Sequence, residues 1–337
     1  MSLHSKSFVR RVTAKAWVGL VSGAKALLGA RHKTMILRSA ANGTDRSVSI
    51  RVPLQNRLEY IQRWSSLYDY WLPQMIALAS QRFPDEVFID VGANVGDTVL
   101  AARLAGCTAR AVAIEASPAF AALLRRNLAE HPELTGETQV VEAVVVGKSK
   151  NIEFQVHRTA TGLTRPASSD GDAQSAAKVA DGLAVVRLDE LNIRRCSVLK
   201  IDTDGFDAFI LDGAMEWLGE TRPVIFAETE VTSAEGVPLW RSVLERLWQM
   251  GYVRYILFDN EGGLCSHGTL DSNSIRPIGD LIAYSYQEAL RFTQGERLKM
   301  PVHYFDLALF STERVPFYDE YSQNVERYYS SRRIAGT

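Results

Sequence analysis

A glycine-containing turn within residues 88–97 has the residue types of a ligand-binding site. In FIDVGANVGD an apolar run ends at Asp90, Gly92 and Gly96 follow four residues apart, and a helix is expected directly afterwards. Glycines let the main chain approach a ligand closely, and the start of a helix supplies N–H groups without intrahelical partners. Because Asn94 stands where the dinucleotide fingerprint has its second glycine, the spacing disfavours a nicotinamide or flavin cofactor. Asn94 either contacts the ligand or caps the helix.

Two acidic residues end the next two apolar runs. Glu115 closes AVAIEA, 25 residues after Asp90, and Glu142 closes QVVEAV. A carboxylate at the first position can accept two hydrogen bonds from a ribose diol, and one at the second lies where an adenine edge would be. The combination predicts an S-adenosylmethionine site. Its expected residues are Asp90, Gly92, Asn94, Gly96, Glu115 and Glu142.

Four further acids follow two later apolar runs. Asp202 and Asp204 come after SVLKI, and Glu228 and Glu230 end PVIFAETE; alternation along a strand would put the two acids of each pair on one side. Methyl transfer from a sulfonium to a hydroxyl needs alignment and removal of the hydroxyl proton, which a carboxylate with a raised pKa can perform. We therefore predict three catalytic residues, Asp202, Glu228 and Asp204.

Two alternatives stay open for these acids. Carboxylate oxygens are the ligands of Mg²⁺, so a metal-dependent reaction is one alternative, although no specific metal ligand is predicted. In the other, Asp202 binds the amino group of the cofactor and Asp204 caps the helix that begins near Phe206.

Other polar residues are weaker candidates. His267 and His303 follow the predicted strands, and either could be a general base because imidazole titrates near neutral pH. Lys200 is expected to be a packing or ion-pair residue rather than a nucleophile. The sequence 259–263 (DNEGG) predicts a hairpin turn, with contact to a polar substrate as the alternative.

Strands and helices must alternate to position these residues. The runs VFIDVG, AVAIEA, QVVEAVVV, SVLKID and PVIFAE predict strands, and the segments between or after them predict helices over 96–106, 118–130, 206–218 and 235–250. Such alternation is typical of βαβ units, in which a mainly parallel sheet carries helices on both faces. The carboxyl ends of parallel strands share one edge, which brings the acids and the glycine turn together.

The order of these motifs resembles the FkbM family of S-adenosylmethionine-dependent methyltransferases. The resemblance spans residues 86–310 and is carried by DVGANVGDT, AIEASPAFAALLRRNL, VRLDEL, SVLKIDTDGFDAFILDGA and PVIFAETE. It implies a Rossmann-like class I α/β fold with a seven-stranded, mainly parallel sheet, and O-methylation of hydroxyl groups on sugars, polyketides or similar metabolites. Asp204 stands where the family usually has the acidic residue of its D-x-E-G segment.

Four parts of the chain follow from these patterns. We expect a basic amphipathic arm over 1–34, a hairpin turning at 42–43 followed by helices over 35–83, a methyltransferase domain over 84–315, and a helical tail over 316–337 packed on the outside. Pro73 is expected to divide the helical pattern before the domain. Residues 159–182, rich in Ala, Ser, Gly and Asp, predict a mobile loop. The acceptor pocket is expected to depend on that loop and on a loop over 259–280.

The charges of the arm and the rest of the chain differ in sign. Residues 1–44 hold eight Lys and Arg and no Asp or Glu, whereas the remaining residues hold 30 basic and 39 acidic side chains. Over 8–28 the apolar residues recur at helical spacing, with Trp17 among them, which predicts either peripheral contact with an anionic membrane surface or docking on a protein surface.

Composition and cysteine usage limit the remaining choices. Three widely spaced cysteines and no long apolar run favour a cytoplasmic protein, with peripheral contact at the inner membrane face as an extension. A small-molecule or glycan acceptor is expected, and an oligomer is compatible with the pattern. The alternatives are a nucleic-acid methyltransferase that binds phosphates through its arm, which the acidic body disfavours, and a non-enzymatic interaction module.

Overall fold

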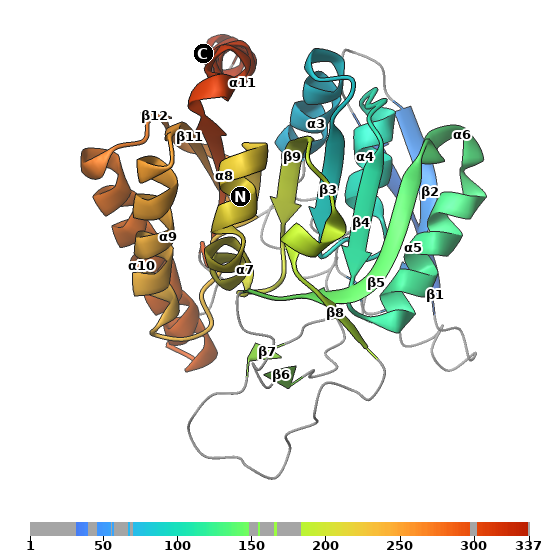
Figure 1. Cartoon of the computed structure of the whole chain (residues 1–337), viewed down its shortest axis with the longest axis horizontal. Coiled ribbons are helices and arrows are strands. Elements are labelled where there is room, and N and C mark those ends of the chain that lie inside the picture. The colour runs from blue at the N-terminus through green and yellow to red at the C-terminus, as the bar shows by residue number, and fades with distance from the viewer. Residues whose placement is uncertain are drawn as a thin grey trace, which may run out of the picture.

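A nine-stranded sheet forms the centre of the protein (Figure 1). A computed structural model describes residues 32–39, 46–54, 56, 67, 70–147, 154–155, 165–166, 183–296 and 302–335. The strand order is β12-β11-β13-β10-β9-β3-β4-β5-β8. The strands of this sheet are β3 (Val87–Val91), β4 (Ala111–Glu115), β5 (Thr138–Val145), β8 (Ala184–Val186), β9 (Cys196–Ile201), β10 (Val224–Glu228), β11 (Tyr252–Asp259), β12 (Leu264–Thr269) and β13 (Phe305–Ser311).

The sheet confirms the predicted fold class. Strands β11, β10, β9, β3, β4, β5 and β8 run in one direction, and β12 and β13 run against them. The run from β5 to β11 is the expected seven-stranded, Rossmann-like sheet. Outside these seven strands, β8 pairs at one edge of the sheet and β12 at the other.

Helices cover both faces of the sheet and bury two separate apolar cores. Side chains of α3 (Trp71–Arg82), α4 (Asp97–Leu104), α5 (Pro118–Glu130) and α11 (Val315–Ala335) pack on one face. Side chains of α7 (Asp207–Gly213), α8 (Met215–Thr221), α9 (Gly236–Gln249) and α10 (Ser272–Thr293) pack on the other. Shorter elements are α6 (Pro132–Thr135), η2 (Leu188–Leu191) and η3 (Thr312–Arg314). The strands that carry acids at their ends are thus held rigidly from both sides.

The predicted loop over 259–280 is wrong. Residues 259–263 turn between β11 and β12, as the hairpin interpretation predicted, but α10 begins at Ser272. The Asp271 carboxylate caps this helix by accepting hydrogen bonds from the backbone N–H groups of Asn273 and Ser274, both at 2.9 Å. The segment therefore contains a hairpin and the start of a 22-residue helix.

An N-terminal hairpin packs on the domain. β1 (His32–Ser39) pairs antiparallel with β2 (Arg46–Pro53), and its predicted turn at 42–43 lies outside the described residues. The side-chain amide of Asn127 in α5 holds the hairpin, because it accepts from the Arg51 backbone N–H at 2.8 Å and donates to the Arg51 carbonyl at 3.0 Å.

The expected C-terminal helix is present as α11, and it closes one face. The Tyr321 hydroxyl donates to the carbonyl of Trp71, the first residue of α3, at 2.9 Å. Tyr329 donates to the carbonyl of Gly262 in the β11–β12 turn, also at 2.9 Å. Pro73 lies in the first turn of α3, so it marks the start of that helix.

Several predictions concern residues that the structure does not describe. The arm over 1–31, with its membrane contact through 8–28, lies outside the described residues, as does most of the loop over 159–182. Within that loop only Arg165–Pro166 is described, as strand β7, which pairs with β6 (Phe154–Gln155). Among the described residues, no helix is long and apolar enough to cross a membrane.

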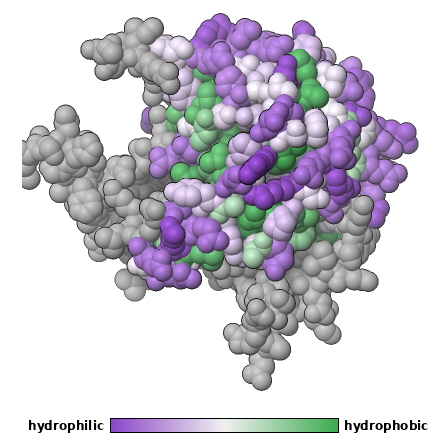
Figure 2. Space-filling model, turned by 90° about the vertical axis from the view of Figure 1, so that its left-hand side faces the viewer, coloured by the Kyte–Doolittle hydropathy of each residue, from purple (hydrophilic) through white to green (hydrophobic). Residues whose placement is uncertain are grey.

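The side of the molecule that carries α9, α10 and β12 mixes apolar and polar surface (Figure 2). The exposed large apolar side chains of these helices are Trp248 on α9 and Leu281 and Tyr284 on α10. Oligomerisation remains a prediction, since nothing in the structure shows what would cover this face.

Candidate functional site

The predicted site residues gather at the edge where β3, β4, β9 and β10 end (Figure 1). Asp90 and Glu115 belong to β3 and β4, Glu228 is the last residue of β10, and Asp202 directly follows β9. Parallel pairing of β4, β3, β9 and β10 brings these strand ends side by side. The sheet therefore brings together side chains that are up to 138 residues apart in the sequence, as Asp90 and Glu228 are.

The turn after β3 can be made only by glycine at two positions. Gly92 has φ +79°, and a Cβ atom there would lie 1.9 Å from the Asp202 carbonyl oxygen. Gly96 has φ +84°, and its Cβ would lie 2.4 Å from Leu124 Cδ1 in α5. Both positions combine a left-handed backbone with a close contact, so the turn packs tightly against β9 and α5.

Asn94 and Glu115 form the polar lining of this turn. The Asn94 backbone N–H donates to Glu115 Oε2 at 2.8 Å, and the Ser117 backbone N–H donates to Glu115 Oε1 at 2.7 Å. Burial raises the pKa of Glu115 to about 7, although the two N–H donors lower it. The Asn94 side-chain oxygen is buried and has no hydrogen-bond partner among the described residues. It does not cap α4, whose first turn follows Gly96 without a side-chain cap.

Asp90 lies beneath the turn and is paired with Lys200. The Lys200 ammonium is 2.9 Å from Asp90 Oδ1 and 3.4 Å from Asp202 Oδ2, and it donates to the Gly92 carbonyl at 3.0 Å. Burial lowers the pKa of Lys200, but the neighbouring carboxylates outweigh burial and hold that pKa well above its ordinary value. Lys200 is thus the expected ion-pair residue, and it joins the glycine turn to the end of β9.

Asp202 and Glu228 form a hydrogen-bonded carboxyl pair. The Asp202 side chain is 50% exposed, whereas Glu228 is 8% exposed. Burial, followed by the charges of Asp202 and Glu230 and the hydrogen bond to Asp202, raises the pKa of Glu228 well above its ordinary value. The raised pKa favours the protonated form of Glu228, which can donate a hydrogen bond to the Asp202 carboxylate.

Asp204 is not placed by strand alternation as predicted. β9 ends at Ile201, and Asp204 lies in the following turn with φ 52°, so the two-residue period no longer applies. It also does not cap the next helix, whose preceding residue, Phe206, has no side-chain cap. Burial, with the charges of Asp202 and Glu230, raises the pKa of Asp204 to about 8.

The sequence reasoning missed Asp207. Its side chain is fully buried and accepts hydrogen bonds from Thr203 and from the Glu228 backbone N–H. The available signal was an acid at the start of a helix five residues after Asp202, within KIDTDGFD.

Glu142 and the two histidines lie at the margins of the site. Glu142 is inside β5 rather than at its end, level with Glu115, and it pairs with Arg125 of α5 at 2.8 Å. His303 precedes β13 on the site's edge of the sheet, 3.4 Å from the Asn260 side-chain nitrogen. His267 lies within β12 and contacts Tyr318 and Glu326 of α11.

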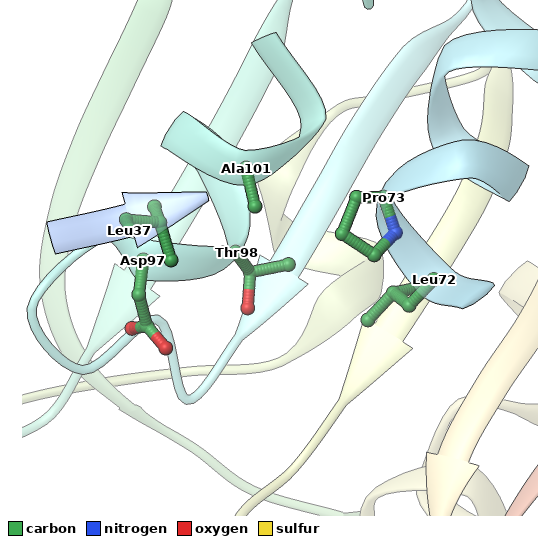
Figure 3. A pocket seen from close by; sticks show the side chains of 6 residues that line it. All are labelled: Leu37, Leu72, Pro73, Asp97, Thr98 and Ala101. Atoms are coloured by element: carbon green, nitrogen blue, oxygen red, sulfur yellow. The ribbon is translucent and has the colours of Figure 1, made fainter. Parts of the chain in front are cut away.

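A small hollow opens beside the start of α4 (Figure 3). It is shallow and open to solvent, and its walls come from β1, α3 and α4. Figure 3 shows Asp97 and Thr98 on the α4 side and Leu72 and Pro73 on the α3 side. Burial raises the pKa of Asp97 to about 6. The hollow adjoins the glycine turn rather than the acidic strand ends.

The Mg²⁺ alternative finds no support. Among the described residues, no group of three or more His, Cys, Asp or Glu side chains is arranged to hold a metal ion.

Comparison with known proteins identifies one domain family. The family described as the methyltransferase FkbM domain matches residues 90–254. No curated protein sequence matches the chain.

Solved structures with some likeness to the chain are distant. The FkbM methyltransferase of Methylobacillus flagellatus matches with a TM-score of 0.30 and 14% identity, over 45% of this chain and 37% of that chain. The precorrin-6y C5,15-methyltransferase of Geobacter metallireducens matches with a TM-score of 0.32 and 14% identity, over 71% of this chain and 87% of that chain. An O-methyltransferase of Bacillus cereus in complex with SAH matches with a TM-score of 0.36 and 16% identity, over 59% of this chain and 80% of that chain. The likeness to the FkbM family therefore rests on the domain match over residues 90–254.

Proposed function

Because the chain carries the methyltransferase domain of the FkbM family, it is an S-adenosylmethionine-dependent methyltransferase, and we propose that it methylates a hydroxyl oxygen of a neutral acceptor such as a sugar, glycan or related metabolite. The observation that carries this proposal is the pair of Asp202 and Glu228 at the ends of adjacent strands. Asp202 is half exposed and lies against the glycine turn, where a bound cofactor and an acceptor hydroxyl can meet.

The residues of the turn fit the cofactor. The unpartnered Asn94 side-chain oxygen is an acceptor for a ligand hydroxyl or amine, and the glycines leave the main chain open to close approach. Glu115 is oriented by two backbone donors and still has lone pairs for a ribose diol. Asp90 has no exposed surface, so it would support the cofactor through Lys200 and the turn. Glu142 remains a prediction for the adenine.

The protein's own part in the reaction is to position the acceptor and to accept a proton. The bound cofactor supplies an electrophilic methyl group. Asp202 is the carboxylate that receives the hydroxyl proton, since it is exposed and Lys200 stabilises its charge. Glu228, whose raised pKa favours its protonated form, orients the Asp202 carboxylate by donating a hydrogen bond to it. Asp202, Asp204, Glu228 and Glu230 together form an acidic rim after β9 and β10, which Asp204 completes.

The charge of this rim supports a neutral acceptor. The charges of Asp202 and Glu230 raise the pKa values of Asp204 and Glu228, and Lys200 is engaged by Asp90 and Asp202. A phosphate placed beside these acids would be repelled, which argues against a nucleic acid or a sugar phosphate as acceptor. A neutral polyol carries no such cost and can donate its hydroxyl hydrogens to the carboxylates.

The test is methyl transfer from S-adenosyl[methyl-¹³C]methionine to pooled acceptors. Three pools would be compared: neutral oligosaccharides and polyketides, sugar phosphates, and total RNA. Label in the neutral pool, with a carbon-13 chemical shift of an oxygen-bound methyl and resistance to alkali, would support the proposal. Label confined to RNA or to nitrogen would overturn it. Failure of calorimetry to detect S-adenosylmethionine binding would favour the non-enzymatic alternative.

Three further predictions rest on features outside the described residues or on no structural observation. They are peripheral membrane contact through residues 8–28, self-association, and a cytoplasmic location. Deleting residues 1–31 and comparing liposome binding with methyl transfer would separate placement of the protein from its chemistry.

A further inference from the structure

Asp207 joins the ends of the two strands that carry the carboxyl pair. Its side chain is fully buried at the start of α7. Its Oδ2 accepts from the Thr203 backbone N–H at 3.1 Å and from the Thr203 hydroxyl at 2.8 Å. Its Oδ1 accepts from the Glu228 backbone N–H at 3.1 Å. One carboxylate therefore links the turn after β9 to the last residue of β10.

This link begins where direct pairing of the strands stops. The last paired residues of β9 and β10 are Ile201 and Ala227, so pairing between these two strands does not hold the residues that follow. On the other side of β9, the Asp202 backbone N–H still donates to the Val91 carbonyl of β3 at 3.0 Å. Asp204 and Gly205 have φ of 52° and 98°, and these two left-handed residues turn the chain back toward Thr203. Beyond the last paired residues, the hydrogen bonds of Asp207 replace the backbone hydrogen bonds that join β9 to β10.

The other side of β10 is already fixed by β13. The Thr229 backbone N–H donates to the Phe305 carbonyl at 2.8 Å, and the Phe305 N–H donates to the Thr229 hydroxyl at 3.0 Å. Since β10 is held on that side, the link through Asp207 determines how far the β9 turn lies from Glu228. Asp202 adjoins Thr203, so its carboxyl group moves with that turn.

We propose that Asp207 is a positioning residue for methyl transfer, which holds Thr203 and Glu228 and so sets the separation of the Asp202 and Glu228 carboxyl groups. This rests on the proposed function, in which that pair handles the hydroxyl proton. Asp207 has no exposed surface and acts only through the groups that it holds.

The test measures the proton of Glu228 in the cofactor-free protein, so it needs no acceptor. The carbonyl-stretching band of protonated Glu228 would be assigned by infrared difference against Glu228→Gln and followed through a pH titration. Asp207→Asn replaces one acceptor oxygen by a donor, and Asp207→Glu keeps the charge but changes the geometry. We expect both variants to lower the pH at which Glu228 ionises by about one unit or more, because the hydrogen bond to Asp202 weakens. If Glu228 ionises at the same pH in Asp207→Glu as in the wild type, only the charge of Asp207 and not its geometry affects Glu228, and the proposal is overturned.

If substitution of Asp207 prevents folding, a second pair of variants tests whether its hydrogen bonds control the ionisation of Glu228. Thr203→Val removes one of the three hydrogen bonds and keeps every charge, and Thr232→Val makes the same change at an exposed threonine beside Gly205. A smaller downward shift for Thr203→Val, with none for Thr232→Val, is the expected result. Equal titration in Thr203→Val and wild type would overturn the proposal.

Cofactor affinity separates this proposal from the proposed function. We expect the dissociation constant of S-adenosylmethionine to change by less than about twofold in the folded variants, because the glycine turn is held by other contacts. A loss of cofactor binding that accompanies the shift would make Asp207 a general structural residue and would overturn its specific role. No cofactor binding by the wild-type protein would overturn the proposed function and leave the Glu228 titration still decisive for Asp207.

Discussion

Gly92 faces the carbonyl oxygen of Asp202 so closely that a Cβ atom at position 92 would lie 1.9 Å from it. The Asp202 backbone N–H also donates to the Val91 carbonyl at 3.0 Å. The cofactor turn and the residue proposed to accept the proton are therefore in direct main-chain contact. A change in either one must displace the other.

Gly92→Ala is expected to destabilise the protein strongly. The variant combines a left-handed φ with overlap against backbone, which should lower the free energy of unfolding by about 3 kcal/mol or more. Gly106→Ala is the matched control, because Gly106 has φ +101° but nothing within 4 Å of the added Cβ. Denaturant unfolding should show a much smaller loss for the control. Equal losses would mean that φ alone, and not the contact with Asp202, requires glycine.

Lys200→Met should leave a buried carboxylate without its cation. Breaking such a pair costs about 3–5 kcal/mol in stability when the partner stays charged. Because protonation of Asp90 relieves this cost, the loss should grow as the pH rises, and Asp90→Asn in the same chain should recover part of it. Denaturant unfolding of the single and double variants over a range of pH would measure both effects. A double variant no more stable than Lys200→Met would show that the Asp90 pair is not the cause.

Asp202→Asn and Glu228→Gln should differ in their effect on turnover. Asparagine cannot accept the hydroxyl proton, so we expect the rate to fall by about 10²–10⁴-fold with cofactor binding retained. Glutamine can replace protonated Glu228 as a donor to Asp202, so its effect should be below about tenfold. Initial rates on the acceptor pool that takes up label would show the asymmetry. A larger loss for Glu228→Gln would move the role of base to Glu228.

The sequence predicted the features that a few adjacent residues determine. Gly92 and Gly96 could be recognised because their backbone conformation and close contacts exclude other residues, and Glu115 because it ends an apolar run. The position of Asp204 was missed because β9 ends at Ile201, before Asp204. No local sequence pattern marks the last residue of a strand to within about two or three residues.

Features that depend on distant contacts could not be predicted in this way. The hydrogen bond from Glu228 N–H to Asp207 joins residues on different strands and becomes visible only once β9 and β10 are paired. Helix α10 was missed although two local signals were present, the Asp271 cap and the helical spacing of Ile275, Ile278 and Ile282.

Stability of the cofactor-free protein should depend on pH through Glu115. Burial raises its pKa from 4.5 to about 7, so the folded state binds this proton more tightly than the unfolded state does. The free energy of unfolding must then fall as the pH rises from about 4.5 to about 7, by about 3 kcal/mol for this group, and level off above that range. Glu115→Gln cannot ionise, so its stability should fall less over the same interval. Subtracting the two unfolding curves isolates the Glu115 contribution from that of Asp97, Asp204 and the other acids. A difference between wild type and variant that stays constant from pH 4.5 to 8 would mean that Glu115 ionises in the folded protein as it does in the unfolded chain.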